Sequence, residues 1–499
     1  MTGIAENDLS LPRFEWDPVN IAEFYSKAET SAGRALPVPE LNLVLCSRRA
    51  LEQLPGVIDK LDARGIADVL IVQDNTPMQR SNVNLKHLVK RQLQATGRNV
   101  STLTLEGAEG QNLTTSQVKI DQVRQAIQSN PVVIALGSGC ITDIAKHACF
   151  ETGQMQDEVI PLIAIQTANS VCAFTSRMTV LTINGVKRTV PSRMANVLIM
   201  DTQILKDAPP IYRTGGLGDV AVAAVTFADL HLAASLGMGK WNQLAYETSS
   251  DIRNILLGQH ASIADGGIIG QEVAGKLMAL AGLALTLCGD SAPLSGYEHM
   301  TSHMLDMAAK SNGRAVANHG HQCALATVLS LLLYRHIIEK LDAGAININT
   351  CYPDEKTMRR KIDTVFKQID TSGAAAAECA SDYMQKLEKW RLARPLFETF
   401  LSNWEQEKTR LQKHLMSPEQ FIDLLCKIGH PLRFEELEVP LGRDEVRWAF
   451  KNAHLMRKRF AIGDLAFLGG FFDETLCDQI FEEFDHLTNA IIKHGGKLD

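Results

Sequence analysis

Between residues 41 and 205, short apolar runs alternate with amphipathic stretches, and this alternation constrains the fold more than any other feature. Six of the apolar runs are predicted strands: LNLVLC, ADVLIVQD, VSTLTL, VVIALG, PLIAIQT and NVLIMD. Segments between several of them, such as RALEQLPGVIDKLDARG and TTSQVKIDQVRQAIQSN, have helical periodicity. Strands that alternate with helices predict a mainly parallel sheet covered on both faces.

The character of the sequence changes near residues 205–215, where Pro209-Pro210 and Gly215-Gly216 interrupt the pattern. Beyond this point, to about residue 480, the chain is rich in Ala and Leu and has no strand-like run. We therefore expect three parts: an irregular N-terminal segment at 1–40, an α/β domain at 41–210, and an all-α domain at 211–499. The charged stretch 353–415 in the last part is predicted to be a solvated helical hairpin.

Composition excludes several classes of protein. The chain has 499 residues and a net charge of −7, so it lacks the basic footprint of a nucleic-acid binder. Its ten cysteines form no CxxC pair, which favours reduced thiols in a cytoplasm. The N-terminus lacks the order of a signal peptide. The most apolar stretch, 268–289, contains Gln271, Glu272 and Lys276, so we interpret it as a buried helix and expect no membrane span.

A glycine-rich turn follows the predicted strand VVIALG. Gly137, Ser138 and Gly139 precede a helix-like segment that carries Asp143 and Lys146. Glycines at such a turn let the backbone approach an anion, whose charge then lies against N–H groups at the start of the helix. An ordinary tight turn has the same pattern, and the turn alone does not separate the two interpretations.

Hydroxyl side chains follow the next strand in a similar way. Thr167, Ser170, Thr175 and Ser176 lie in IAIQTANSVCAFTSRMT. Hydroxyls just past a strand end suit a ligand at the carboxyl edge of the sheet. Helix capping by Ser and Thr explains them equally well when the segment is taken alone.

Metal-binding residue types gather in three stretches of the helical half: GGLGD with Asp219, SGYEHMTSHMLDM with Glu298, His299 and His303, and VANHGHQ with His319 and His321. His299 and His303 are four residues apart and would share one face of a helix. One carboxylate and two imidazoles would make a three-ligand site with positions left for a substrate oxygen. A lone histidine is more often a core residue, but this density favours a metal.

The order of these motifs resembles one known group of enzymes. A Gly-rich turn is followed by T-x-x-S, GxGD, S-G-x-E-H-x-x-S-H and HG, and then by KIGHP at 427–431 and MRKRFAIGDLAFLGG at 456–470. This order is similar to that of the iron-containing alcohol dehydrogenase superfamily, and within it the longer bacterial sn-glycerol-1-phosphate dehydrogenases. The resemblance extends over about residues 40–475 and implies a homo-oligomer.

The resemblance implies roles for individual residues. It assigns a nicotinamide dinucleotide, NAD or NADP, to Gly137, Ser138, Gly139, Asp143, Thr167, Ser170 and Ser176, with Asp74 near the adenosine. It assigns one divalent metal, zinc with iron or nickel as alternatives, to Asp219, His299 and His319. His303 would then reach the substrate. The implied reaction interconverts a carbonyl and an alcohol, here glycerone phosphate and sn-glycerol 1-phosphate, by hydride transfer.

Three positions depart from the family pattern. Cys172 replaces an aspartate on the substrate side, Ala292 replaces an arginine, and His321 replaces the glutamate of HGE. Cys172 is either a reactive thiol or, more plainly, a small residue that makes room for a bulkier substrate. The loss of a carboxylate and an arginine predicts a substrate other than glycerone phosphate.

Two other functions stay open at this point. One is a 3-dehydroquinate synthase-like cyclase, which also uses a metal and NAD, although its metal carboxylate is normally a glutamate and not an aspartate such as Asp219. The other is a catalytically impaired paralogue that binds or supports a partner. Retained metal ligands argue against that paralogue, while Cys172 and Ala292 favour it.

Overall fold

A computed structural model describes residues 11–62, 68–107, 112–127, 131–183 and 186–493. By packing, the chain divides into two units, each of which is described by itself. The first holds residues up to 182, 188–220 and 247–290, and the second holds 183–187, 221–246 and 291–499. We call them the sheet unit and the helical unit.

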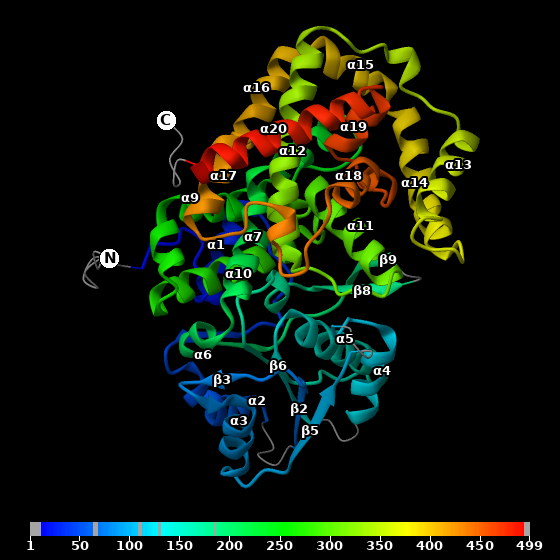
Figure 1. Cartoon of the computed structure of the whole chain (residues 1–499). Helices are drawn as coiled ribbons and strands as arrows, with labels where there is room; N and C mark the ends of the chain where they lie inside the picture. The colour runs from blue at the N-terminus through cyan, green and yellow to red at the C-terminus, as the bar shows by residue number, and fades with distance from the viewer. Residues whose placement is uncertain (1–10, 63–67, 108–111, 128–130, 184–185, 494–499) are drawn as a thin grey trace. The chain divides into compact units, whose positions relative to one another are not determined.

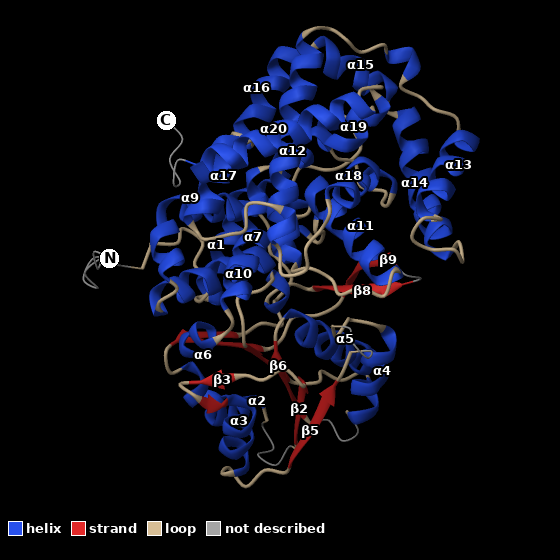
Figure 2. Cartoon of the chain, viewed as in Figure 1, coloured by secondary structure: helices blue, strands red, loops and turns tan. Residues whose placement is uncertain are grey.

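The sheet unit is built on one six-stranded sheet (Figures 1 and 2). In spatial order its strands are β1 (Leu43–Ser47), β10 (Val197–Asp201), β7 (Leu162–Gln166), β6 (Val132–Gly137), β2 (Val69–Asp74) and β5 (Val100–Leu105). Every neighbouring pair is parallel. All six strands match the predicted ones, and the expected fold class is confirmed.

Helices follow most of these strands, and those between two parallel strands form the crossovers that such pairing requires. They are η2 (Ala50–Gln53), α2 (Leu54–Leu61), α3 (Leu85–Gln94), α4 (Gln117–Ala126), α5 (Gly139–Gln156) and α6 (Thr202–Asp207). Two further strand pairs were not predicted: the antiparallel pair β3 (Gln79–Arg80) with β4 (Val83–Asn84), and β8 (Met178–Ile183) with β9 (Val186–Pro191). Strands β3 and β4 have two residues each and β9 is largely polar, so these three strands give little hydrophobic signal.

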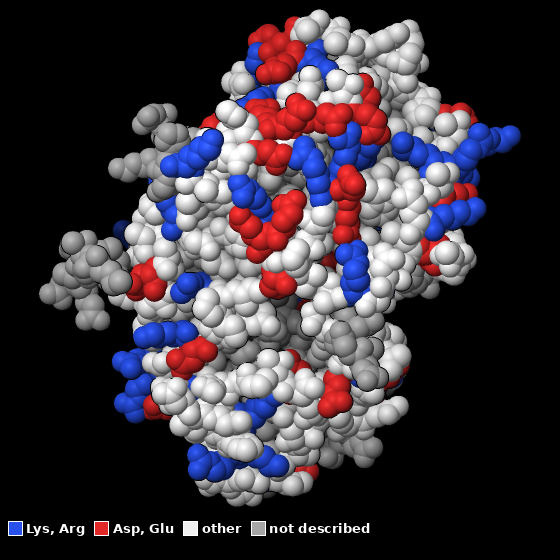
Figure 3. Space-filling model, in the orientation of Figure 1, with Lys and Arg blue, Asp and Glu red and all other residues white. Residues whose placement is uncertain are grey.

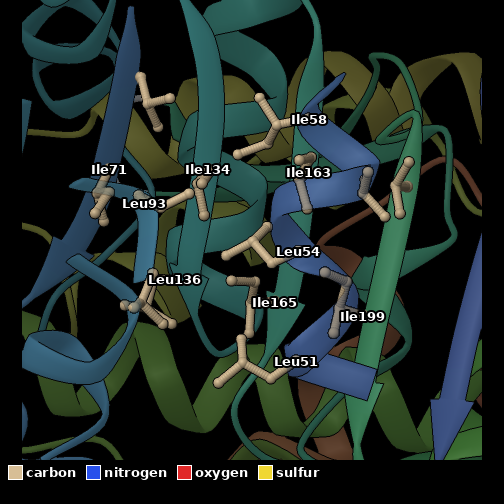
Figure 4. Packing of buried hydrophobic residues seen from close by; sticks show 14 of the residues in the cluster. Leu51, Leu54, Ile58, Ile71, Leu93, Ile134, Leu136, Ile163, Ile165 and Ile199 are labelled. Carbon is tan, nitrogen blue, oxygen red and sulfur yellow. The ribbon is translucent and has the colours of Figure 1, made fainter. Parts of the chain in front are cut away.

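The core of this unit lies between the sheet and the helices that follow β1. Figure 4 shows Leu51, Leu54 and Ile58 packed against Ile163 and other residues of the central strands. Strands β6, β7 and β10 are buried along their whole length, which explains why their sequences are continuous apolar runs. Each buried Leu or Ile contributes about 1.5–3 kcal/mol relative to an exposed one.

Three further features of the sheet unit differ from the predicted division. Segment 1–40, expected to be irregular, contains helix α1 (Ile21–Ala32), which is capped by Asn20. Helices α9 (Gln243–Asp265) and α10 (Ile268–Cys288) pack with the sheet unit, as does most of α7 (Pro210–Ala221), although they follow residue 210.

Close packing against α10 explains this grouping. A Cβ at Gly282 would lie 2.2 Å from Thr175 Oγ1, so the helix backbone touches the segment after β7 directly. Thr175 Oγ1 also donates to the carbonyl of Ala279 at 2.7 Å. Helix α10 and the stretch 210–235 are long and apolar enough to cross a membrane. However, 78% of the apolar 18-residue segment of α10 is buried, and 89% of that in 210–235. Burial of this extent is typical of core helices, as expected for 268–289.

In the helical unit the described residues form helices and connecting turns, apart from the 183–187 segment at the end of β8 and the start of β9. The helices are α8 (Thr226–Ser235), α11 (Tyr297–Ser311), α12 (His319–Asp342), α13 (Glu355–Phe366), α14 (Ala374–Leu392), α15 (Arg394–Ser402), α16 (Trp404–His414), α17 (Pro418–Lys427), α18 (Arg443–Asn452), α19 (Ile462–Leu468) and α20 (Glu474–Lys493).

The charged stretch 353–415 differs from a solvated hairpin. It forms the four helices α13 to α16, and it buries Trp390 and Phe397. Lys386 is also buried, and its Nζ lies 2.6 Å from Asp464 Oδ1. Burial raises the pKa of Asp464 to about 6 and lowers that of Lys386. The stretch is therefore part of the helical core, which charge patterning alone does not reveal.

Surface charge in the helical unit is mixed. Lys and Arg side chains alternate with Asp and Glu over the helices visible in Figure 3. Many of them are paired, for example Arg335 with Glu419 at 2.8 Å and Arg447 with Glu474 at 2.7 Å. On the face shown in Figure 3, the basic side chains of these helices are interspersed with acidic ones.

Candidate metal and dinucleotide sites

Three histidines lie together in the helical unit. His299 and His303 are one turn apart on α11, and His319 is the first residue of α12. Ring centroids are 6.3 Å apart for His299 and His303, 5.1 Å for His299 and His319, and 5.4 Å for His303 and His319. The hydrogen-bond partner of each ring determines what it can do, because an imidazole nitrogen either holds a proton or offers a lone pair.

His299 donates from Nδ1. Its Nδ1 lies 2.9 Å from Glu298 Oε1, which also accepts the backbone N–H of Gly296 at 2.6 Å. The carboxylate is an acceptor, so the imidazole supplies the proton of this bond. The lone pair is thereby placed on Nε2, in the arrangement that orients metal-binding histidines in many proteins.

A longer chain of hydrogen bonds specifies His319 in the same way. Gln322 donates its amide protons to Asp306 Oδ1 at 3.0 Å and to the carbonyl of Ala317 at 2.9 Å. Its Oε1 accepts the hydroxyl proton of Ser302 at 3.2 Å. Since that proton is used, Ser302 Oγ accepts from His319 Nδ1 at 2.9 Å. His319 Nε2 therefore also has its lone pair.

His303 has the opposite arrangement. Arg457 donates to His303 Nδ1 at 2.7 Å, and a guanidinium has no acceptor. Burial, and then the positive charge of Arg457, lower the pKa of His303 well below its usual range. The ring is neutral with its proton on Nε2, so it is a hydrogen-bond donor and has no lone pair for a metal.

A buried carboxylate holds the start of α11 in place. Asp229 accepts the N–H of Tyr297 at 2.9 Å, the N–H of Ile462 at 2.8 Å and the hydroxyl of Tyr334 at 2.7 Å. Burial, and secondly the charge of Glu298, raise the pKa of Asp229 to about 7. Three helices are thus attached at the turn that precedes His299.

Cys323 lies beside the same cluster and was not predicted. Potential ligand atoms of His299, His319 and Cys323 lie within 4.8 Å of one another. Cys323 Sγ is 3.8 Å from His319 Nδ1 and 3.6 Å from its Nε2. Nearly equal distances place the sulfur beside the ring and away from the Nε2 lone pair, so it is not aligned as a ligand. Its position four residues after His319 is the sequence signal that could have revealed it.

Asp219, the predicted carboxylate ligand, lies in the last turn of α7 in the sheet unit and is buried. Its role as a metal ligand stays a prediction.

The glycine-rich turn joins β6 to α5 in the sheet unit. Gly137 pairs in register with Gln166 of β7, and Thr167 N–H donates to the carbonyl of Gly137 at 3.2 Å. Parallel strands end at a common edge, so the two turns lie side by side. Ser138 is the N-cap of α5, yet it makes no side-chain cap bond. The first N–H groups of α5 are therefore left to another acceptor.

Both glycines have packing reasons of their own. A Cβ at Gly139 would lie 2.2 Å from Val171 Cγ2, and one at Gly137 would lie 2.6 Å from Ile141 Cβ. The turn after β7 thus packs directly on the start of α5. A bulky substitution at Gly137 would disturb this packing as well as any ligand, so it cannot isolate a role in binding.

The other predicted cofactor residues differ in whether their side chains already have hydrogen-bond partners. Ser170 is buried and its Oγ has no hydrogen-bond partner, which suits a missing ligand. Ser176 Oγ accepts Met178 N–H at 3.0 Å and has a structural bond. Thr167 is buried at the strand end. Asp74 ends β2, where its Oδ1 accepts the N–H of Thr76 at 3.1 Å.

Asp143 and Lys146 serve the structure of α5. Lys146 Nζ is fully buried and donates to three backbone carbonyls between residues 173 and 178. It also lies 2.9 Å from Asp143 Oδ1. A lysine with these partners holds α5 against the segment that follows β7. A role of Asp143 in cofactor binding stays a prediction.

Each departure from the family pattern has a defined place. Cys172 is partly exposed and begins the short helix η3 (Cys172–Phe174) in the sheet unit. Ala292 lies in η5 (Ala292–Leu294) of the helical unit, where Arg459 bonds to Ser291 Oγ at 2.8 Å and to the carbonyl of Ser295. A guanidinium is therefore present at this turn without an arginine at 292.

The third departure, His321, is buried in the first turn of α12. Its Nδ1 lies 3.4 Å from Glu438 Oε2, and its ring is 4.7 Å from that of His430. Burial lowers the pKa of His430 to about 3. His321 therefore turns to a separate group of residues and is not one of the three clustered imidazoles.

Comparison with known proteins agrees with this arrangement. Residues 46–209 match the family model described as iron-containing alcohol dehydrogenase. Glycerol-1-phosphate dehydrogenase [NAD(P)+] of Bacillus subtilis (strain 168) is 23% identical over 441 residues, which cover 88% of this chain and 94% of that protein. The enzyme of the same name from Methanothrix thermoacetophila is 29% identical over 202 residues, 40% of this chain, and the match spans about half of that relative, 54%.

Solved structures show the same fold. A probable glycerol dehydrogenase from Sinorhizobium meliloti 1021 has a TM-score of 0.55 at 13% identity and covers 91% of this chain and 98% of that one. Glycerol dehydrogenase from Schizosaccharomyces pombe has a TM-score of 0.54 at 16% identity, with 92% of each chain covered.

The fold is thus a parallel α/β sheet unit followed by a helical unit, as in these dehydrogenase structures. The family model and the curated relatives support a place for this chain among proteins similar to the iron-containing alcohol dehydrogenases. The resemblance drawn from the motifs is confirmed.

Proposed function

We propose that this protein is a metal-dependent, NAD(P)-linked oxidoreductase of the glycerol-1-phosphate dehydrogenase type, which interconverts a carbonyl and an alcohol. The proposal rests mainly on the different tautomers of three adjacent histidines, His299, His319 and His303. Two of them carry the lone pair on Nε2, while the third has an N–H there. A site that binds a metal and also directs a substrate oxygen needs both kinds of imidazole.

His299, His319 and Asp219 would hold one divalent ion, for which zinc is our first assignment and iron or nickel the alternatives. The two imidazoles fit the ion because each already donates its Nδ1 proton to a buried acceptor. When bound, such an ion polarises a carbonyl oxygen and stabilises negative charge that develops on it. Because the Cys323 sulfur is not aligned with the His319 lone pair, coordination positions remain for the substrate.

His303 would direct the substrate oxygen. Its Nε2 proton can be donated to that oxygen, and Arg457 keeps the ring in this tautomer through Nδ1. Because burial and Arg457 keep the pKa of His303 low, the ring stays neutral at neutral pH. We also propose that Cys172 lies on the substrate side, because it stands in the motif where the family pattern has a substrate-side aspartate.

The dinucleotide would bind in the sheet unit. Its pyrophosphate would occupy the start of α5 beyond Gly137, Ser138 and Gly139, where the helix lacks a side-chain cap. The unpartnered hydroxyl of buried Ser170 would contact the same ligand. We retain Thr167, Ser176, Asp143 and Asp74 as further contacts from the resemblance, and leave the choice between NAD and NADP to measurement.

We further propose a cytoplasmic homo-oligomer that acts on a small molecule. All ten cysteines are free of disulfides, which fits a reducing compartment. The relatives matched are named as dehydrogenases of a small phosphorylated alcohol, which supports a substrate of that size.

The departures from the family pattern at Cys172 and Ala292 provide a direct test of the proposed function. We expect poor reduction of glycerone phosphate by the wild-type protein, because Cys172 and Ala292 lack the charged groups of the family pattern. Each lost charged contact costs on the order of 1.5–3 kcal/mol, or roughly ten- to a hundredfold in rate. Cys172→Asp with Ala292→Arg should raise the rate of NADH oxidation with glycerone phosphate.

The control is the conservative pair Cys172→Ser with Ala292→Met, which changes size without charge and should leave the low rate unchanged. Efficient turnover of glycerone phosphate by the wild-type protein would reject the altered substrate. It would leave an ordinary glycerol-1-phosphate dehydrogenase, in which Arg459 at the 291–295 turn supplies the positive charge.

A further inference from the structure

We propose that Gln322 is a positioning residue for the metal: through the hydroxyl of Ser302, it decides which nitrogen of His319 keeps its lone pair. Gln322 touches neither the imidazole nor any predicted ligand atom in the bonds described above. The inference rests on the proposed function, because it takes His319 as a metal ligand.

The orientation of the Gln322 amide is determined by its surroundings. Its Nε2 is 3.0 Å from Asp306 Oδ1 and 2.9 Å from the Ala317 carbonyl, and both of these atoms are acceptors. The amide nitrogen therefore faces them, and Oε1 faces Ser302. Asp306 is held in turn by Lys187, which pairs with its other oxygen. Since Gln322 is only 1% exposed, water has little access to substitute for either half of the amide.

One proton transmits this orientation to the ring. A serine hydroxyl has a single proton, and Gln322 Oε1 takes it. Ser302 can then only accept from His319 Nδ1, which places the lone pair on Nε2. Without the amide oxygen, Ser302 becomes free to donate to Nδ1. That bond favours the other tautomer, in which Nε2 holds the proton and cannot bind a metal.

The predicted order of metal affinities is unusual for a buried network. Gln322→Met keeps the length of the side chain and removes the strong acceptor, so Zn²⁺ should bind roughly 10–100-fold more weakly. Ser302→Ala removes both the donor and the acceptor for Nδ1 and should cost less. The double variant Gln322→Met with Ser302→Ala should therefore bind Zn²⁺ more tightly than Gln322→Met alone. If Gln322 and Ser302 had a purely structural role, the double variant should bind Zn²⁺ more weakly than either single variant, because the effects of two buried substitutions would add.

The experiment is a titration of metal-free protein with Zn²⁺ in competition with a chromophoric chelator, for the wild type and these three variants. Ser330→Ala is the matched control, because Ser330 is buried on the same helix and bonds only to the Ala326 carbonyl of its own turn. It should leave the affinity unchanged. In parallel, ¹⁵N shifts of labelled histidine should show His319 Nε2 unprotonated in the wild type and protonated in Gln322→Met.

Rescue by the double variant, together with the change of tautomer, would establish the proposal. Wild-type affinity in Gln322→Met, or additive losses in the double variant, would overturn it and leave the proposed function intact, since the wild type would still bind one ion. If the wild-type chain binds no Zn²⁺, the metal-dependent function fails and the role of Gln322 fails with it.

Discussion

Replacing Ser138 by aspartate should nearly abolish binding of NADH while leaving the protein at least as stable. Aspartate is a favoured N-cap residue, so it should satisfy the first N–H groups of α5, which the serine does not cap. The same carboxylate would occupy the place that we assign to the pyrophosphate. Two like charges about 4 Å apart repel by about 4 kcal/mol at the effective dielectric of a protein surface. The expected loss of affinity is roughly 30- to 1000-fold.

Ser138→Asn is the matched control, because it has the shape and capping ability of aspartate without the charge. It should bind NADH within a few-fold of wild type, as measured by titration of NADH fluorescence. Thermal unfolding of all three proteins completes the comparison. Equal NADH affinity for the aspartate and asparagine variants would place the dinucleotide elsewhere and make 137–139 a structural turn only.

Replacing His299 by alanine should remove the bound metal almost completely. Loss of an outer hydrogen-bond partner costs about 10- to 100-fold in metal affinity, and loss of a ligand itself should exceed this range. The fold should persist, because neighbouring Met300 and Met304 are buried on α11 and Glu298 retains the Gly296 N–H. Elemental analysis of the purified variant measures the outcome.

His336→Ala serves as the control for His299→Ala. His336 lies on α12 and bonds to Glu483 at 3.0 Å, outside the histidine cluster. This variant should retain one ion per chain. Full occupancy in His299→Ala with a normal fold would remove His299 from the ligand set.

The strands of the sheet and the candidate ligands were accessible from the sequence because each rests on a local pattern. Continuous apolar runs such as VVIALG identify strands buried on both faces, and the spacing of His299 and His303 places them on one helical face. Turns that follow such strands are easily found in the same way. The order of motifs then connected these local patterns to a superfamily.

Contacts between residues that are distant in the sequence determine the features that the sequence could not show. Glu298 adjoins His299 in the sequence, but nothing local in EHMTSH indicates that His303 has the opposite tautomer, since Arg457 is 154 residues from His303 along the chain. The structural use of Lys146 depends on carbonyls 27 to 32 residues away. The packing of α10 on the sheet unit likewise depends on a close approach at Gly282, which hydropathy does not predict.

The proposed reaction is a metal-dependent transfer of hydride between NAD(P)H and a carbonyl. Its most direct test is NAD(P)H oxidation by the full chain with a panel of aldehydes, ketones and glycerone phosphate, before chelation, after chelation, and after Zn²⁺, Fe²⁺ or Ni²⁺ is restored. We predict turnover of at least one carbonyl, loss of that turnover on chelation, and its recovery with one of the ions. Absence of NAD(P)H oxidation with every carbonyl, in a protein that binds both metal and dinucleotide, would contradict the account and favour a cyclase or a non-catalytic paralogue.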